Sequence, residues 1–322
     1  MGAPRTFDEK RARIAILAEE APSGAAAELR RFLADKNGYL VGEAAQAANR
    51  LGLSELTPDL AAAFARLLVD GAKVDKGCAG KNRIVEALLA FDAREPDVYL
   101  AGLRHCQPEP AFGEPIDTAA GLRGLCAVAL FHMDHPTALL DVTPLLADPE
   151  PVTRGAAADA IGSSGEEAGA AVLHIKALLG DREPDVLGAC YRGLLRLLPS
   201  RYLRFVAQVL NGDDEGPAEA AALALGESRL PSALPALKDA VEGLASGKLR
   251  DSVLLGAALL RLDEANTYLI SLVEEGPEGQ ATAALSALAL HRHDAKLVER
   301  VRQAAEGRRS KKLAAAFAEK FK

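Results

Sequence analysis

The sequence predicts an all-α protein built as an α-solenoid, a single superhelix of about eight helix pairs, and two observations lead to this fold class. Hydrophobic residues make up 49% of the 322 residues, aromatic residues make up only 4%, and Trp is absent. Helix formers such as Ala, Leu, Glu, Lys and Arg therefore outweigh the residues that favour strands. The chain also contains an internal repeat with the length of a helix pair, which is typical of stacked helical units.

The repeat is defined by one segment: a basic residue, two small residues, and then Ala followed by Leu or Ile. Clear copies are KNRIVEAL (81–88), RGLCAVAL (123–130), RGAAADAI (154–161) and LGACYRGL (187–194), and later copies at 218–225 and 281–288 lose the charge. The final Leu or Ile recurs every 29 to 42 residues. One helix pair cannot bury both of its apolar faces, whereas stacked neighbours can.

Each unit is expected to consist of a first helix, a short turn and a second helix that contains the repeat segment. Residues 61–69 and 171–179 are examples of first helices, and the turns are rich in Asp, Gly and Pro, as in DPEP at 148–151. Thr6 and Glu9 fit a capping box that opens a helix to about residue 20, and Ser310 can cap a last helix to about residue 321. We therefore expect one array over 1–322, with a cap helix in 1–23, repeats in 24–292 and a basic cap in 293–322.

An acidic residue stands six positions before the basic residue in three successive units. The pairs are Asp75 with Lys81, Asp117 with Arg123, and Asp148 with Arg154, and together they form an expected acid–base ladder. Asp181 has Leu187 at the corresponding position. The C-terminal half is therefore expected to rely on apolar packing alone.

This pattern resembles the HEAT-repeat family, in particular the short bacterial HEAT-like repeats of the PBS-lyase type, over residues 24–292. In that family an inter-helix Asp and a second-helix Arg form a ladder from repeat to repeat. The resemblance implies a right-handed, armadillo-like solenoid whose second helices line a concave face. It leaves the activity open, because the family includes scaffolds, lyase-type proteins and a few DNA glycosylases.

The charge distribution argues against a nucleic-acid partner. The chain has a net charge of −7, but residues 296–322 hold nine Lys and Arg against three Asp and Glu. The other 295 residues hold 29 basic against 42 acidic residues, a net −13. An acidic body is a poor match for a phosphate backbone, so binding through the basic C-terminal segment remains the least favoured alternative.

The sequence offers no motif for a metal, a cofactor or a catalytic residue. The four cysteines lie in apolar helical contexts without a CxxC pair, as expected for reduced core thiols of a cytoplasmic protein. GCAGKN at 77–82 lacks the spacing of a phosphate loop, and HMDH at 132–135 is best interpreted as a helix end. No apolar run is long enough to span a membrane. We expect a cytoplasmic monomer, and the Ala and Arg content is typical of a GC-rich bacterial genome.

The second helices carry an unusual column of residues directly after the ladder cation. It reads Asn82, Gly124, Gly155 and Gly188, and each helical Gly costs about 1 kcal/mol relative to Ala. Close helix packing is one explanation, and a smooth strip beneath a partner is the other. Together with their charged neighbours, the residues expected to contact a partner on the second helices are Arg83, Glu86, Arg123, Gly124, Arg154, Gly155, Asp159, Arg192 and Arg196.

One connection exceeds its neighbours in length. HCQPEPAFGEPID, residues 105–117, separates the two helices of the third repeat. Three prolines stiffen it around Glu109, Phe112 and Glu114, which could be presented to a partner at low entropic cost. It can serve as a binding element or as a mere connection.

We expect a non-catalytic scaffold that binds a protein or peptide, of acidic character, along the concave face. The alternative is a HEAT-like lyase or small-ligand-binding protein, similar to the bilin lyases. That alternative predicts a closed pocket near His105, Cys126 and His132 with a perturbed ionisable group inside it.

Overall fold

The computed structural model describes residues 6–244 and 247–321, and these residues are predominantly helical. In the first part of the chain the α-helices are α1 (Phe7–Glu20), α2 (Ala25–Leu33), α3 (Gly38–Arg50), α4 (Thr57–Leu68), α5 (Gly71–Val74), α6 (Ala79–Ala90), α7 (Pro96–Leu103), α8 (Ala120–His132), α9 (Ala138–Val142) and α10 (Pro151–Ser163). In the second part they are α11 (Glu167–Leu179), α12 (Pro184–Leu197), α13 (Pro199–Val209), α14 (Glu215–Glu227), α15 (Leu234–Glu242), α16 (Lys248–Leu259), α17 (Asp263–Glu275), α18 (Glu278–Leu288), α19 (Ala295–Gly307) and α20 (Lys311–Lys320).

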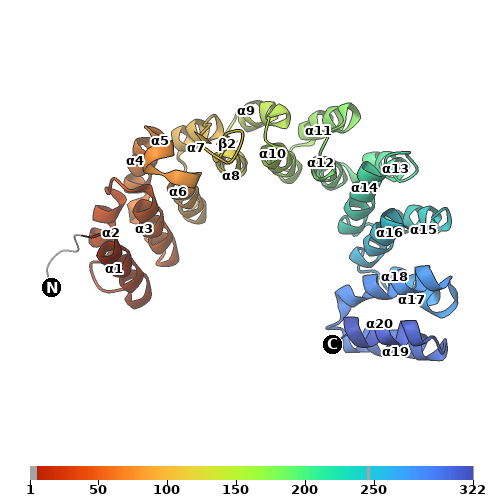
Figure 1. The fold of residues 1–322 in the computed structure, drawn as a ribbon. Helices are drawn as coiled ribbons and strands as arrows, with labels where there is room; N and C mark the ends of the chain where they lie inside the picture. Colours follow the sequence, from red (N-terminus) through yellow and green to blue (C-terminus); the bar gives the residue numbers. More distant parts are fainter. Residues whose placement is uncertain (1–5, 245–246, 322) are drawn as a thin grey trace. The chain divides into compact units, whose positions relative to one another are not determined.

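The prediction of an all-α solenoid is confirmed. Successive helices pair as first and second members of repeats, short 3₁₀ segments tighten several of the turns, and the strands β1 (Pro108–Glu109) and β2 (Ile116–Asp117) form one small hairpin (Figure 1). The handedness of the superhelix and the division into 1–23, 24–292 and 293–322 remain predictions.

The chain divides into two compact units, residues 1–164 and 165–322. In the first unit the second helices α3, α6, α8 and α10 pack side by side in chain order, and α2, α4, α7 and α9 form the other layer. Helix α1 packs against α2 and α3. The capping box of α1 is confirmed, with Glu9 N–H donating to the Thr6 hydroxyl and Thr6 N–H to the Glu9 carboxylate.

In the second unit α12, α14, α16 and α18 form the layer of second helices. Two glycines allow α14 and α16 to approach backbone to backbone. A Cβ placed on Gly226 would meet the backbone of Gly256, closer than any real Cβ contact. At the end of the unit α20 packs against α18 and α19, and Leu313 N–H donates to the Ser310 hydroxyl, which caps α20 as predicted.

No helix among the described residues is both long enough and apolar enough to cross a membrane.

Candidate functional site

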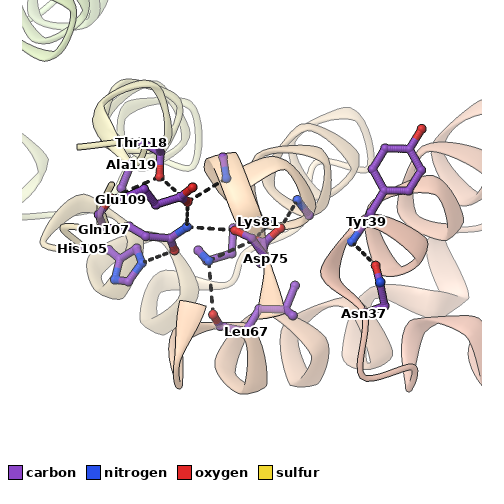
Figure 2. A network of polar contacts seen from close by, with 12 residues as sticks. Asn37, Tyr39, Leu67, Asp75, Lys81, His105, Gln107, Glu109, Thr118 and Ala119 are labelled. Carbon is purple, nitrogen blue, oxygen red and sulfur yellow. Dashed lines mark hydrogen bonds and ion pairs between the residues drawn. The ribbon is translucent and has the colours of Figure 1, made fainter. Parts of the chain in front are cut away.

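The ladder begins with a buried ion pair in the first unit. Lys81 Nζ lies 2.9 Å from Asp75 Oδ2 and donates to the carbonyl of Leu67 at 3.1 Å (Figure 2). The same Asp75 carboxylate accepts the N–H groups of Gly80 and Lys81 in the first turn of α6. Both side chains are almost fully buried, so this pair fixes the turn and is not available to a partner.

Arg123 connects two repeats. Its guanidinium lies 2.7 Å from Asp117 Oδ2 in its own repeat and 2.9 Å from Asp148 Oδ2 in the next. Burial lowers the pKa of Arg123, but the two carboxylates outweigh this effect and raise the pKa above its ordinary value. Because the residue is only 2% exposed, Arg123 belongs to the ladder and not to the surface on which we expected it to meet a partner.

The third ladder pair, Asp148 with Arg154, and the acid beyond the ladder, Asp181, make other contacts. Arg154 donates to the backbone carbonyls of Asp148 and Pro149, while the Asp148 carboxylate is held by Arg123. Asp181 pairs with Lys176 at 2.7 Å, and its side chain is buried. The expectation that the C-terminal half relies on apolar packing alone is therefore wrong, because this acid finds its cation five residues earlier, in the first helix.

The long connection is a hairpin whose base is tied to the neighbouring repeat. Pro108 pairs with Asp117 and Glu109 with Ile116. The buried amide of Gln107 donates to the carbonyl of Asp75 and to Glu109 Oε1, both at 2.8 Å (Figure 2). The base of the hairpin is therefore hydrogen-bonded to the turn that contains the Asp75–Lys81 ion pair.

Glu109 holds this base together. Its Oε1 also accepts the Gly77 N–H at 2.7 Å and the Thr118 hydroxyl at 2.9 Å. Burial raises the pKa of Glu109, but these hydrogen bonds together with that of Gln107 outweigh it and keep the pKa below its ordinary value. Glu109, which we expected at a binding surface, thus stabilises the hairpin from within.

The tip of the hairpin carries the residues that remain accessible. Phe112 is fully exposed and Glu114 is exposed at this tip, and Ile116 is exposed in β2. Phe112 thus offers a large apolar ring to the solvent on a hairpin whose base is held by hydrogen bonds.

The residues of the small-ligand alternative lie in three different environments. Cys126 is completely buried beside Gly102, and burial raises the pKa of its thiol. His105 lies in the hairpin network, where burial lowers its pKa, and His132 is exposed and bonds Asp92 at 2.8 Å. Cys106, expected in the core, is exposed instead. No cluster of three or more metal-binding side chains occurs in the part of the chain that the structure describes.

The predicted second-helix residues of the first unit are only partly accessible. Arg83 is bonded to Glu43 and its guanidinium carbon lies 5.6 Å from the centre of the Tyr39 ring. Glu86 is exposed, and Asp159 is half-buried. Arg83 and Glu86 share α6, whereas Asp159 belongs to α10, two second helices further along.

The glycines directly after the ladder cation in the second helices are not all explained by close helix packing. A Cβ on Gly124 would lie 2.6 Å from that of Ala156, so α8 and α10 can pack closely only because Gly124 is a glycine. A Cβ on Gly155 would meet nothing within 4 Å, and packing gives no reason for a glycine there. The packing interpretation therefore holds at Gly124 but not at Gly155.

In the second unit Arg192 and Arg196 border a hollow of about 130 Å³, together with Glu227. Arg192 Nε lies 3.6 Å from Glu227 Oε2. A second, larger groove between α16 and α18 was not anticipated, because its lining comes from segments more than 20 residues apart.

Sequence reasoning also missed an apolar surface on α11, formed by the exposed side chains of Ile175, Leu178 and Leu179. Its signal is present in the sequence, since AVLHIKALL has apolar residues on more than one side of a helix.

Comparisons with known proteins give structural similarity without a family. No family model matches the chain, and no curated protein matches it. Among solved structures, an engineered protein aligns over 98% of this chain and 94% of its own, with 16% identity and a TM-score of 0.41. The complex of CpcE and CpcF of phycocyanin lyase from Nostoc sp. PCC7120 aligns over 76% and 94%, with 16% identity and a TM-score of 0.40.

Human deoxyhypusine hydroxylase, in complex with glycerol, aligns over 83% of this chain and 96% of its own, with 18% identity and a TM-score of 0.35. These TM-scores are too low to carry an argument about activity, and a shared fold does not transfer function.

Proposed function

We propose that this protein is a non-catalytic scaffold that binds another protein, with the hairpin of residues 108–117 as its principal contact. The observation that carries the proposal is the fully exposed ring of Phe112 at the tip of a hairpin whose base is fixed by the buried Gln107.

The exposed ring of Phe112 could contribute to the free energy of binding. Burying a Phe side chain at an interface contributes about 1.5–3 kcal/mol, and binding hot spots are enriched in aromatic anchors. The hydrogen bonds to Glu109 order the hairpin before any partner arrives. Less conformational entropy is then lost on association.

The two buried thiols Cys78 and Cys126 are poorly suited to act as nucleophiles. Burial raises the pKa of Cys78 to about 12 and raises that of Cys126 as well. A thiol with a raised pKa is a weak nucleophile at neutral pH. Charged side chains on the second helices, among them the exposed Glu86 and Arg196 and the half-buried Arg192, would supply charge complementarity toward carboxylate-bearing and mixed-charge segments of a partner.

Site-specific photo-cross-linking tests this function. A benzoylphenylalanine placed at position 112 in the full-length chain should give a discrete adduct with one protein in a lysate of the source cells. The matched control places the same group at Leu140, which is 75% exposed on the first-helix layer. Adducts that are absent at 112, or identical at 112 and 140, would overturn the proposal.

A further inference from the structure

Helix α11 in the second unit exposes an apolar face that the proposed function does not use. Its exposed residues are Glu167, Ala168, Ala171, Ile175, Leu178 and Leu179, so all but one are apolar. The first helices α13 and α17 of the same unit expose only polar and charged side chains, as is usual for the outer layer of a solenoid. The face of α11 is therefore an exception within its own unit and is suited to a contact with another molecule.

Four residues of this face have the spacing of a helix–helix contact. Ala168, Ala171, Ile175 and Leu178, which we call the α11 seam, follow one another at intervals of three, four and three residues. This is the spacing of the a and d positions of a heptad, whose side chains insert between those of a facing helix. Leu173 is completely buried on the opposite side of α11, which packs against α12. The spacing therefore favours a helix as the occupant of the exposed side.

The sizes of the seam side chains favour a second α11 that runs in the opposite direction. The seam is small at its N-terminal half, with Ala168 and Ala171, and large at its C-terminal half, with Ile175 and Leu178. An antiparallel copy centred on Leu173 brings Leu178 opposite Ala168 of the other chain. The same arrangement brings Ile175 opposite Ala171, so each of the layers combines one large and one small side chain, as dense packing requires. A parallel copy would leave a gap between alanines at one end of the seam.

The charged residue on this face favours the same direction. Glu167 lies in the first turn of α11, next to the seam. A parallel pair would place the two copies of Glu167 side by side, and like charges repel. In the antiparallel pair they are about 18 Å apart along the helix axis, which is more than the screening length of about 8 Å at physiological salt. The seam itself contains no charged residue, so its burial leaves no charge without water.

Helix α13 supplies a charged rim beside the seam. It packs against α11, with the rings of His174 and Phe205 4.7 Å apart between their centroids. It contains no acid, exposes Arg201 and Arg204 in its N-terminal half, and is followed by the acidic segment 213–215. A two-fold axis that reverses α11 also reverses α13, so the arginines of one copy lie toward the acidic segment of the other. An apolar centre with a complementary polar rim is the usual anatomy of a protein interface.

We propose that the α11 seam pairs antiparallel with the α11 seam of a second copy of this chain, which makes the protein a two-fold symmetric dimer. The interface is isologous, because the same residues contribute from both sides. This proposal replaces the monomer expected from the sequence. The seam spans about 20 Å of helix and offers less than the roughly 800 Å² per partner of a standard interface, so the dimer is reversible and its Kd lies in the micromolar range.

Sedimentation velocity of the purified full-length chain tests the dimer. Between about 1 and about 200 µM the average mass of the wild type should rise from one chain toward two. Leu178→Lys puts a charge into the seam and should raise the Kd about tenfold or more. The matched control is Leu140→Lys, since Leu140 is 75% and Leu178 65% exposed and both variants should fold, which circular dichroism verifies. A wild type that stays monomeric, or a dimer that Leu178→Lys leaves unchanged, would overturn the proposal.

A pair of complementary variants tests the direction of the helices. Ala168→Glu and Leu178→Lys should each remain monomeric alone, because each homodimer would hold a charge against an apolar side chain in two layers. A mixture of the two chains should associate. One layer of the mixed dimer then joins the new carboxylate to the new ammonium group, and the symmetry-related layer remains Ala against Leu. Parallel pairing provides no such layer, so a mixture that stays monomeric contradicts the antiparallel arrangement.

Vesicles of phosphatidylglycerol and phosphatidylcholine serve as the second probe. If the wild type is monomeric in solution and floats with vesicles in a manner that Leu178→Lys abolishes, the face is a membrane contact and the dimer is wrong. The contact does not involve the hairpin, so a Phe112→Ala chain should dimerise as the wild type does. Failure of the hairpin as a binding element and failure of the dimer are therefore distinguishable.

Discussion

Arg123 in α8 and Asp148 in the turn before α10 lie 2.9 Å apart, between Nε and Oδ2, although they belong to successive repeats. The same guanidinium holds Asp117 in its own repeat, so one cation fixes two turns. Breaking this contact should therefore affect the stacking of repeats as well as one local turn.

Replacing Arg123 by Leu should lower the free energy of unfolding of the first unit by about 3–5 kcal/mol, because two largely buried carboxylates lose their cation. Urea denaturation followed by circular dichroism measures it. The matched control is Arg104→Leu, whose salt bridge with Asp141 is exposed on the arginine side and should contribute less than about 1 kcal/mol. Equal effects of the two substitutions would show that Arg123 is not structural.

Two glycines of the same column should respond in opposite directions to alanine. Gly124→Ala should destabilise the protein by about 1–2 kcal/mol, since overpacking outweighs the gain in helix propensity. Gly155→Ala should stabilise it by up to about 1 kcal/mol, because nothing lies within 4 Å of the new methyl group. Thermal unfolding of both variants provides the comparison, and destabilisation by Gly155→Ala would indicate that packing does require glycine there.

The hairpin network should weaken in acid. Burial raises the pKa of Asp117, but hydrogen bonds from Gln107 and Arg123 outweigh it and hold the pKa below its ordinary value, as at Glu109. Such groups contribute stability that is complete above their unfolded pKa, about pH 4, and is lost as the pH falls through the folded value. Urea midpoints between pH 7 and pH 3 should decrease less for Asp117→Asn than for wild type; parallel curves would contradict this assignment.

Glu109 should control the order of the hairpin without controlling the fold. Glu109→Ala removes the acceptor for the Gly77 N–H and the Gln107 amide. Hydrogen exchange at Gly77 should become faster, with the Asp75–Lys81 turn still folded. Glu114→Ala, at the exposed tip, is the control and should leave the exchange rates unchanged.

The sequence was sufficient for the fold class and for two of the three acid–base pairs expected within one repeat. The Asp75–Lys81 and Asp117–Arg123 contacts follow from local spacing, because six residues bring the acid at the turn next to the cation in the second helix. The contact of Arg123 with Asp148 could not be predicted in this way, since it depends on how two repeats stack. The Lys176–Asp181 pair has a different spacing and was missed for that reason.

The sequence identified the segment that forms the candidate site, but not which of its side chains are exposed. The unusual length of the connection and its three prolines singled out residues 105–117. Which of its side chains point toward the turn that contains Asp75 depends on the hairpin register. The Glu109 carboxylate is therefore half-buried in the hydrogen-bond network at the hairpin base, and Phe112 is fully exposed. The groove between α16 and α18 has no sequence signal, because its lining residues come from helices that only the folded unit brings together.

The most direct test of the central claim is the affinity of the protein that cross-links at position 112, measured by calorimetry for wild type and Phe112→Ala. Removal of a buried aromatic anchor should raise the Kd about 30-fold or more, which corresponds to a loss of about 2 kcal/mol. Because Phe112 is fully exposed, the free protein should keep its stability. Unchanged affinity with an intact fold would contradict the account and leave the hairpin as a connection alone.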